Sequence, residues 1–224
     1  MLLRDGDLGL EVLVLRRTDA AVFSPGAHVF PGGALDPADG GDEVAAYCNG
    51  FDDVAASKAL GIAHGGLAYF VAAVRECFEE VGVLLAAPSA DDQLCAFDDA
   101  STAARFAEHR RAVHDGKQLL SSMCAREDLT LAVDRLVPFS HWITPPGPPR
   151  RFDTRFFVAG APARQEATPD DREATEARWA RPTDLLDAFG RGEIDLILPT
   201  QRSLETLADH RDATSAIAAT PPEA

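Results

Sequence analysis

Cysteine is scarce in this chain, and its few positions follow no metal-binding or disulfide pattern. The four cysteines, Cys48, Cys77, Cys95 and Cys124, are widely spaced, with no Cys-x-x-Cys pair and no cysteine and histidine spacing typical of zinc. This arrangement indicates neither a disulfide framework nor a zinc site. It favours reduced thiols, as in a cytoplasmic protein.

Basic residues and long apolar runs are also scarce. With 36 acidic residues against 21 lysines and arginines, the formal net charge is −15, which argues against binding nucleic acid or an anionic membrane. No charged N-terminal segment precedes an apolar run, and no apolar run approaches the length that spans a bilayer. We therefore expect a soluble, cytoplasmic protein with no nucleic-acid or membrane partner.

The apolar content is sufficient for a folded core. At 224 residues and 46% apolar content, a single domain with insertions is the simplest interpretation. A run rich in valine and leucine predicts a strand at residues 10–17, alternation predicts strands at 136–144 and 151–158, and another short strand begins at 177. Capping and stop residues predict helices at 101–114, with Ser101 as the cap, and at 117–126, 182–189 and 199–209, and Asp52-Asp53 marks a further helix start. Histidines 109 and 114 are expected at the surface of these helices.

One amphipathic stretch, residues 67–81, organises the rest. Glu76, Glu79 and Glu80 fall on one face of a helix because residues three and four apart are neighbours. Apolar side chains cover the opposite face: Leu67, Phe70, Val71, Val74, Phe78 and Val81. Gly82 is a natural left-handed stop. The pattern predicts a helix packed on the core.

The three clustered glutamates suggest a bound cation. Like charges at these spacings destabilise a helix by roughly 0.2–0.5 kcal/mol per pair, and a hard dication such as Mg²⁺ or Mn²⁺ would compensate. Ala72 and Ala73, one turn earlier, leave room for an approaching ligand. A solvated acidic face is the competing interpretation, and the helix alone does not decide between them.

A second motif upstream favours the metal interpretation. Together, the Phe-Pro-Gly-Gly of residues 30–33 and the Arg-Glu-x-x-Glu-Glu-x-Gly-Val of residues 75–83 resemble the signature of Nudix hydrolases. The resemblance implies that Glu76, Glu79, Glu80 and the carbonyl of Gly32 bind Mg²⁺ or Mn²⁺ against a diphosphate. It also implies that Arg75 orients Glu79.

The motif departs from the usual Nudix pattern. Counting back from Arg75 places Leu67 where the family has a glutamate and Gly61 where it has a glycine, whereas Pro-Gly-Gly lies far upstream. An insertion at about residues 35–63 therefore interrupts the box. This resembles a branch of the family that includes coenzyme A diphosphatases, although Val22 stands where that branch has a second arginine.

The resemblance also implies the fold class, which is α+β: a Nudix-type α/β/α sandwich with a mixed central sheet and helical insertions. We expect a single Nudix hydrolase domain over residues 1–214, interrupted at about 35–63 and 87–135, and a flexible tail at 215–224. The helices of the second insertion would form a lid or a homodimer surface, or simply pack on the sheet edge. Their amphipathic spacing does not decide between these interpretations.

Several further residues are candidates for the site. The catalytic residues are expected to be Arg75, Glu79 and Glu176, because relatives often take a metal ligand or general base from a late loop, where Glu173 is the other candidate. Substrate contacts are assigned to Arg17, Phe30, Gly33, Arg151 and Arg155. For Arg151 and Arg155, pairing with Asp153 is an equally weighted structural alternative.

The expected reaction is hydrolysis of a nucleoside diphosphate-linked small molecule. Coenzyme A or an acyl-coenzyme A would give adenosine 3′,5′-bisphosphate and the phosphopantetheine fragment. ADP-ribose or NADH is the alternative substrate. A nucleotide-binding sensor without turnover is the alternative from another functional class, and the complete set of three glutamates argues against it.

Overall fold

A mixed six-stranded sheet forms the centre of the computed structural model, which describes residues 1–147 and 150–219. The strand order is β3-β2-β1-β7-β6, and β8 also pairs with β2. The strands are β1 (Leu2–Gly6), β2 (Gly9–Arg17), β3 (His28–Val29), β6 (Val137–Ile143), β7 (Asp153–Gly160) and β8 (Ala174–Ala180). The β1–β7 pairing is parallel and the others are antiparallel.

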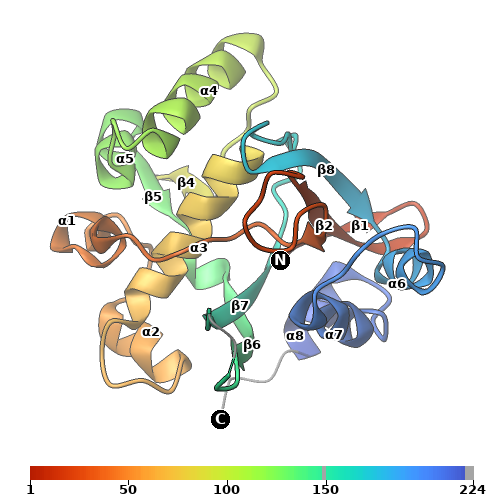
Figure 1. The fold of residues 1–224 in the computed structure, drawn as a ribbon. Helices are drawn as coiled ribbons and strands as arrows, with labels where there is room; N and C mark the ends of the chain where they lie inside the picture. Colours follow the sequence, from red (N-terminus) through yellow and green to blue (C-terminus); the bar gives the residue numbers. More distant parts are fainter. Residues whose placement is uncertain (148–149, 220–224) are drawn as a thin grey trace.

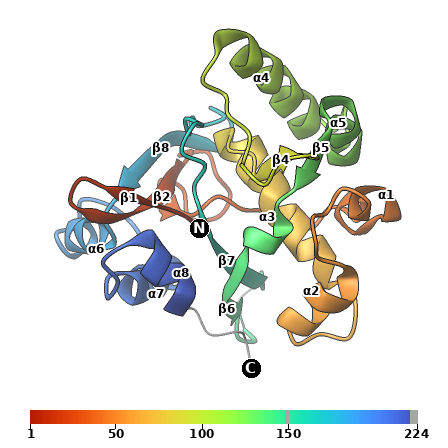
Figure 2. The same cartoon turned by 180° about the vertical axis from the view of Figure 1, so that it is seen from behind.

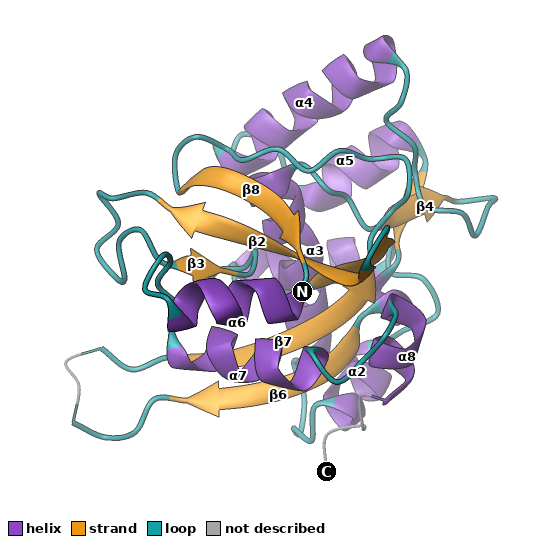
Figure 3. Ribbon diagram, turned by 90° about the vertical axis from the view of Figure 1, so that its right-hand side faces the viewer, coloured by secondary structure: helices purple, strands orange, loops and turns teal. Residues whose placement is uncertain are grey.

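Both faces of the sheet are buried, because β2 is apolar at consecutive positions. Leu13 and Leu15 pack in the cluster that contains the apolar face of α3 (Gly66–Val81). Val12 and Val14 pack on the other side, against residues of α6 (Pro182–Gly190), α7 (Leu198–Leu207) and α8 (Ala213–Ala219). Figure 3 shows the sheet between α6, α7 and α8 in front and α3 behind. The expected α/β/α sandwich is confirmed.

The first insertion forms short helices beside the start of α3. It contains η1 (Pro37–Gly40), α1 (Asp42–Ala45) and α2 (Asp53–Ala59). In Figure 1 these helices lie on the left, and α2 packs beside the N-terminal part of α3. Viewed from behind, they lie on the side of the molecule opposite to α6, α7 and α8 (Figure 2).

The second insertion lies at the other end of α3. Its elements are β4 (Ala86–Pro88), α4 (Ala100–His114), α5 (Leu120–Glu127), β5 (Leu129–Leu131) and η2 (Val133–Arg135). In Figure 1, α4 lies at the top, above the C-terminal end of α3. The expectation of helices alone was incomplete, because β4 and β5 pair as a second, antiparallel sheet.

Three local expectations need correction. Asp99 rather than Ser101 caps α4, since its carboxylate accepts the N–H groups of Ser101 and Thr102. Residues 215–219, expected in a flexible tail, belong to α8, where Ala216 is buried; residues 220–224 lie outside the described part. His109 is not a surface residue, because it is 5% exposed and bonded to Gln118 and Glu127.

No helix in residues 1–147 and 150–219 combines the length and apolar character needed to cross a membrane.

Candidate active site

Helix α3 carries the acidic residues and runs from Gly66 to Val81. It ends at Gly82, whose φ of 71° is left-handed and whose N–H donates to the carbonyl of Phe78. The acidic face is less exposed than its charge suggests, since Glu80 is only 7% exposed. A carboxylate at this depth requires polar partners.

The Pro-Gly-Gly turn lies directly against two of these glutamates. The N–H of Gly32 donates a 2.9 Å hydrogen bond to Oε2 of Glu80. Gly32 has a φ of +153°, which side-chain-bearing residues rarely adopt. At Gly33, an added Cβ would lie 2.5 Å from Oε1 of Glu76. Gly32 is therefore favoured by its backbone conformation, and Gly33 by the close approach of this turn to α3.

Arg75 connects the acids to the first insertion. Its Nη1 donates to Oε1 of Glu76 at 2.9 Å and to Oε1 of Glu79 at 3.3 Å. Its Nε and Nη2 donate to the two carboxylate oxygens of Asp39, and Nη2 also donates to the carbonyl of Ala34. Asp39 is 2% exposed. The expected contact of Arg75 with Glu79 is present, but Glu76 and Asp39 are the closer partners.

These interactions change the ionisation of the site. Burial lowers the pKa of Arg75, but the hydrogen bond and charge of Asp39, with Glu76 and Glu79, outweigh burial and raise it. Burial raises the pKa of Glu76 to about 7, although the charge of Arg75 opposes the rise. Burial likewise raises the pKa of Glu80 to about 8, against the hydrogen bond from Gly32. Burial therefore makes the charged forms of Glu76 and Glu80 harder to reach than in water.

The two late glutamates differ in their surroundings. The charge of Glu173 acts on both Glu76 and Glu80, raising the pKa of each. Glu176 lies on β8 opposite Arg16 and is exposed, and its charge acts on His28 instead. The structure therefore favours Glu173 over Glu176 as the late carboxylate beside the acids of α3.

The expected substrate residues do not all gather at the acids. Phe30 is 6% exposed and packs edge-on against Phe156 in the core. Arg155 donates to the carbonyl of Leu60 and lies over the ring of Tyr69. Arg155 is therefore engaged with the first insertion, and Phe30 belongs to the core.

The other two arginines have different surroundings. Arg151 is exposed and donates to the carbonyl of Thr144. The Nε of Arg17 is buried and has no hydrogen-bond partner among the described residues. The alternative pairing with Asp153 is not seen for either Arg151 or Arg155 in the described contacts, where the Asp153 carboxylate bonds to His141. Arg17 thus offers an unused buried donor that Arg151 does not, as the Nε of Arg178 also does.

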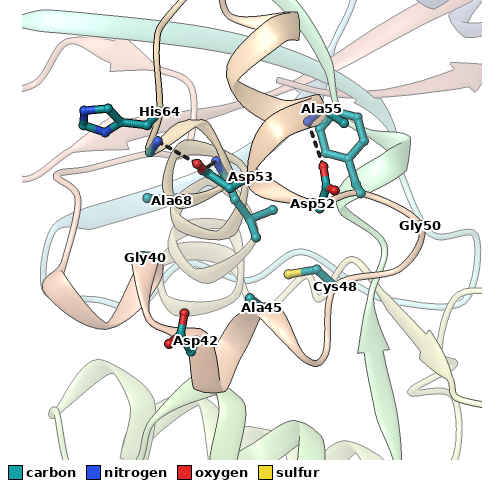
Figure 4. Close-up of a pocket in the computed structure, with 13 residues that line it drawn as sticks. Gly40, Asp42, Ala45, Cys48, Gly50, Asp52, Asp53, Ala55, His64 and Ala68 are labelled. Atoms are coloured by element: carbon teal, nitrogen blue, oxygen red, sulfur yellow. Dashed lines mark hydrogen bonds between the residues drawn. The ribbon is translucent and has the colours of Figure 1, made fainter.

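A separate hollow of about 650 Å³ lies between the first insertion and the start of α3. Figure 4 shows its lining, which includes Asp42, Asp52 and Asp53 and, among the described residues, no lysine or arginine. Asp52 accepts the N–H of Ala55, and Asp53 accepts those of Gly65 and Leu67. Two of these acids therefore cap α2 and α3, and the hollow is unsuited to a phosphate group.

The donor set near α3 suits a hard dication. Carboxylate oxygens are the ligands that Mg²⁺ and Mn²⁺ favour, and a bound cation would offset the cost of ionising the buried Glu76 and Glu80. In residues 1–147 and 150–219, no group of three or more His, Cys, Asp or Glu side chains is arranged to hold an ion. Mg²⁺ commonly uses one or two carboxylates and completes its shell with water and substrate phosphate. The residues present fit such a shared site.

Two residues of this site, Asp39 and His114, were not identified from the sequence. Asp39 lies in the first insertion, and His114 lies on α4 with Arg110, one of an arginine pair that in the sequence was a candidate for phosphate; each reaches Arg75 or Glu79 across the fold. Asp36-Pro37 is a recognisable helix start, but it gives no indication that Asp39 would bind Arg75.

Comparisons with known proteins give a consistent picture. The family model for the NUDT19 Nudix domain matches residues 51–205, which include α3 but begin after the Pro-Gly-Gly turn. Acyl-coenzyme A diphosphatase NUDT19 of Gallus gallus is 30% identical over 227 residues, covering 87% of this chain and 60% of the relative. The protein of that name from Homo sapiens is 29% identical over 229 residues, with 90% and 61% coverage.

A solved structure is similar over the whole chain. The crystal structure of a NUDIX hydrolase from Alicyclobacillus acidocaldarius has a TM-score of 0.78 and 28% sequence identity, and the match covers 100% of this chain and 95% of that one. By contrast, this chain spans about three fifths of the length of the two curated relatives.

Proposed function

Because this chain belongs to the Nudix hydrolase family, with the NUDT19 Nudix domain as its matching model, we propose that it is a metal-dependent diphosphatase of coenzyme A or acyl-coenzyme A. The products would be adenosine 3′,5′-bisphosphate and phosphopantetheine or its acyl ester. One observation carries the proposal: the Pro-Gly-Gly turn lies against two acids of α3, since Gly32 donates to Glu80 and Gly33 leaves room for Glu76, which Arg75 binds. The names of the two NUDT19 relatives support the choice of substrate.

We assign the metal to the acids of α3. Glu76, Glu79, Glu80 and the carbonyl of Gly32 would hold Mg²⁺ or Mn²⁺ together with the substrate diphosphate. When bound, the ions would neutralise the phosphates and lower the pKa of an attacking water. The need for substrate oxygens agrees with the few carboxylates that Mg²⁺ uses in proteins.

The remaining roles belong to residues of the chain itself. Arg75 fixes Glu76 and Glu79 through its hydrogen bonds. Glu173 is our first choice for the base that accepts the proton of the attacking water, with Glu176 second, because only Glu173 acts electrostatically on Glu76 and Glu80. The water oxygen would bond to one phosphorus, and the bridging P–O bond would break.

Two arginines are assigned to substrate binding. Arg17 is the first candidate for a phosphate contact because its buried Nε has no partner among the described residues. Arg151, which is exposed and lies just before β7, is the second. Gly33 allows close approach to Glu76. Arg155 and Phe30 support the site from the fold, since both side chains are engaged elsewhere.

One observation keeps a second substrate open. Val22, at the position where relatives acting on coenzyme A are expected to have a second arginine, is 83% exposed. A side chain without charge at this place would suit a substrate that lacks a third phosphate. ADP-ribose or NADH is therefore the second candidate.

Mass spectrometry of products distinguishes these candidates. The protein would be incubated with Mg²⁺ or Mn²⁺ and coenzyme A, an acyl-coenzyme A, ADP-ribose or NADH, with a chelator as control. We expect adenosine 3′,5′-bisphosphate with phosphopantetheine to form fastest, and only with metal. Faster formation of AMP from ADP-ribose or NADH would replace the first substrate by the second. Cleavage of none of the four would overturn the proposed activity.

A further inference from the structure

Arg110 of α4 joins three segments that are distant in sequence. Its Nε donates a 2.8 Å hydrogen bond to the backbone carbonyl of Glu79 in α3. Its Nη1 and Nη2 donate to Oγ1 and the carbonyl of Thr168, at 3.1 and 3.0 Å. Thr168 lies in the segment of residues 161–173 that connects β7 to β8, which we call the late loop. One guanidinium therefore holds α3 and the late loop against α4.

The same contacts complete the C-terminal end of α3. The last carbonyls of a helix have no partner within it, and cations are favoured there. Arg110 donates to the carbonyl of Glu79, and the N–H of Thr168 donates to the carbonyl of Val81 at 3.0 Å. Next to them, an added Cβ at Gly82 would lie 3.2 Å from Nη1 of Arg110. The late loop is thus attached to the helix end that carries Glu79 and Glu80.

A second contact from α4 fixes the other end of the late loop. Asp115, which follows α4, pairs with Nη1 of Arg172 at 2.8 Å. The Asp170 carboxylate accepts the backbone N–H groups of Glu173 and Ala174. Arg172 immediately precedes Glu173, the late glutamate whose charge acts on Glu76 and Glu80. The loop is therefore held at Thr168 and at Arg172, both within the five residues that precede Glu173.

The end of α4 also reaches the acids directly. Nδ1 of His114 is buried without a hydrogen-bond partner among the described residues and lies 3.9 Å from Oε2 of Glu79. This approach limits how far the Glu79 carboxylate can turn away from Arg75. Arg110, His114 and Asp115 thus all lie on α4 or directly after it.

We propose that Arg110 is a positioning residue for diphosphate cleavage, holding the late loop and Glu173 at a fixed place relative to the acids of α3. The second insertion is then part of the catalytic apparatus, acting as a brace rather than as a lid. This inference rests on the proposed function for its kinetic test, but the position of the loop can be measured without any activity.

The kinetic test compares Arg110→Ala with Arg111→Ala. Arg111 is the exposed neighbour on the same helix, so its removal changes the net charge equally. A misplacement of about 1 Å at a catalytic group can reduce the rate roughly 100-fold. We expect Arg110→Ala to lower kcat about 10- to 100-fold with KM within about threefold, and Arg111→Ala to leave both unchanged. Partial recovery of Arg110→Ala by added guanidinium ion is expected.

Amide hydrogen exchange provides the second readout. Residues 165–173 should exchange at least several-fold faster in Arg110→Ala than in Arg111→Ala, and this holds whether or not the substrate has been found. Equal exchange in the two variants would overturn the proposal that Arg110 holds the late loop in place. Faster exchange with unchanged kcat would also overturn the positioning role and leave a contact of structural importance only.

A milder pair of variants covers the case in which Arg110→Ala does not fold. Arg110→Lys keeps the charge but offers one compact group in place of the fork that spans Glu79 and Thr168. Thr168→Val removes only the Oγ1 acceptor. Both should show the same two effects to a smaller degree, and wild-type kcat and exchange in both would contradict the proposal.

Discussion

The Asp39 carboxylate accepts two hydrogen bonds from Arg75, at 2.8 Å from Nε and 2.9 Å from Nη2, across a separation of 36 residues. Leu67 stands where the Nudix motif usually has a glutamate, and it is buried in the core. The first insertion thus supplies a buried carboxylate to the arginine of α3. The interruption of the motif has a structural role at the site.

Substitution of Asp39 tests this relationship. Asp39→Asn removes the negative charge that pairs with Arg75 and leaves the guanidinium facing an amide in place of a carboxylate. Breaking a buried pair costs roughly 3 kcal/mol or more, and for a domain of this size that would lower Tm by roughly 6–12 °C. Thermal unfolding would measure the change. Glu43→Gln, an exposed residue of the same insertion, is the control, and equal Tm values for the two variants would refute the prediction.

Gly33 tests the approach of the turn to α3. A Cβ there would meet the end of the Glu76 side chain at 2.5 Å, and that side chain can move. We expect Gly33→Ala to fold with a Tm within a few degrees of wild type but to lose activity by about 10- to 100-fold, because the carboxylate is displaced. Gly190→Ala, where the added Cβ meets nothing within 4 Å, should retain full activity. Full activity of Gly33→Ala would show that the position of Glu76 is not critical.

Asp53 gives a prediction about pH. Its carboxylate accepts the N–H groups of Leu67 and Gly65 at the start of α3, and these bonds hold its pKa below the ordinary value of 3.8. A carboxylate with a lower pKa in the folded state stabilises the protein above its unfolded pKa and loses this effect as pH falls.

The measurement is urea unfolding of wild type and Asp53→Asn between pH 7 and 3. Wild type should be the more stable at pH 5–7, and the gap should narrow as pH falls below about 4. Asp7→Asn, at an exposed position, is the control. A gap that stays constant or widens on acidification would show that the Asp53 charge does not hold the start of α3.

The elements of the fold with strong local patterns could be predicted from sequence. The periodicity of residues 67–81 predicted α3 to within a residue, and the valine- and leucine-rich run of 10–17 predicted β2. Asp52 was identified as a helix start and caps α2. Capping at α4 was misplaced because Asp99 and Ser101 are both good caps. The short α8 has no strong pattern, and its packing on the core decides that it is helical.

The surroundings of the candidate site could not be predicted in the same way. Arg75 meets Asp39 across 36 residues, and Arg110 meets Thr168 across 58. Periodicity describes only neighbours within an element, so it cannot rank Asp39 above the other acids of the insertion. For the same reason, sequence did not separate Glu173 from Glu176, which are three residues apart but act on different groups.

The central claim is that the buried acids of α3 are present for catalysis, and Glu80→Gln tests it most directly. The measurement is kcat for coenzyme A cleavage with saturating Mg²⁺, beside the free energy of unfolding, with Glu108→Gln on the exposed side of α4 as control. We expect kcat to fall about 1,000-fold, equivalent to about 4 kcal/mol, while stability is unchanged or higher because a neutral amide is buried more easily than a carboxylate. Wild-type kcat in Glu80→Gln would contradict the account.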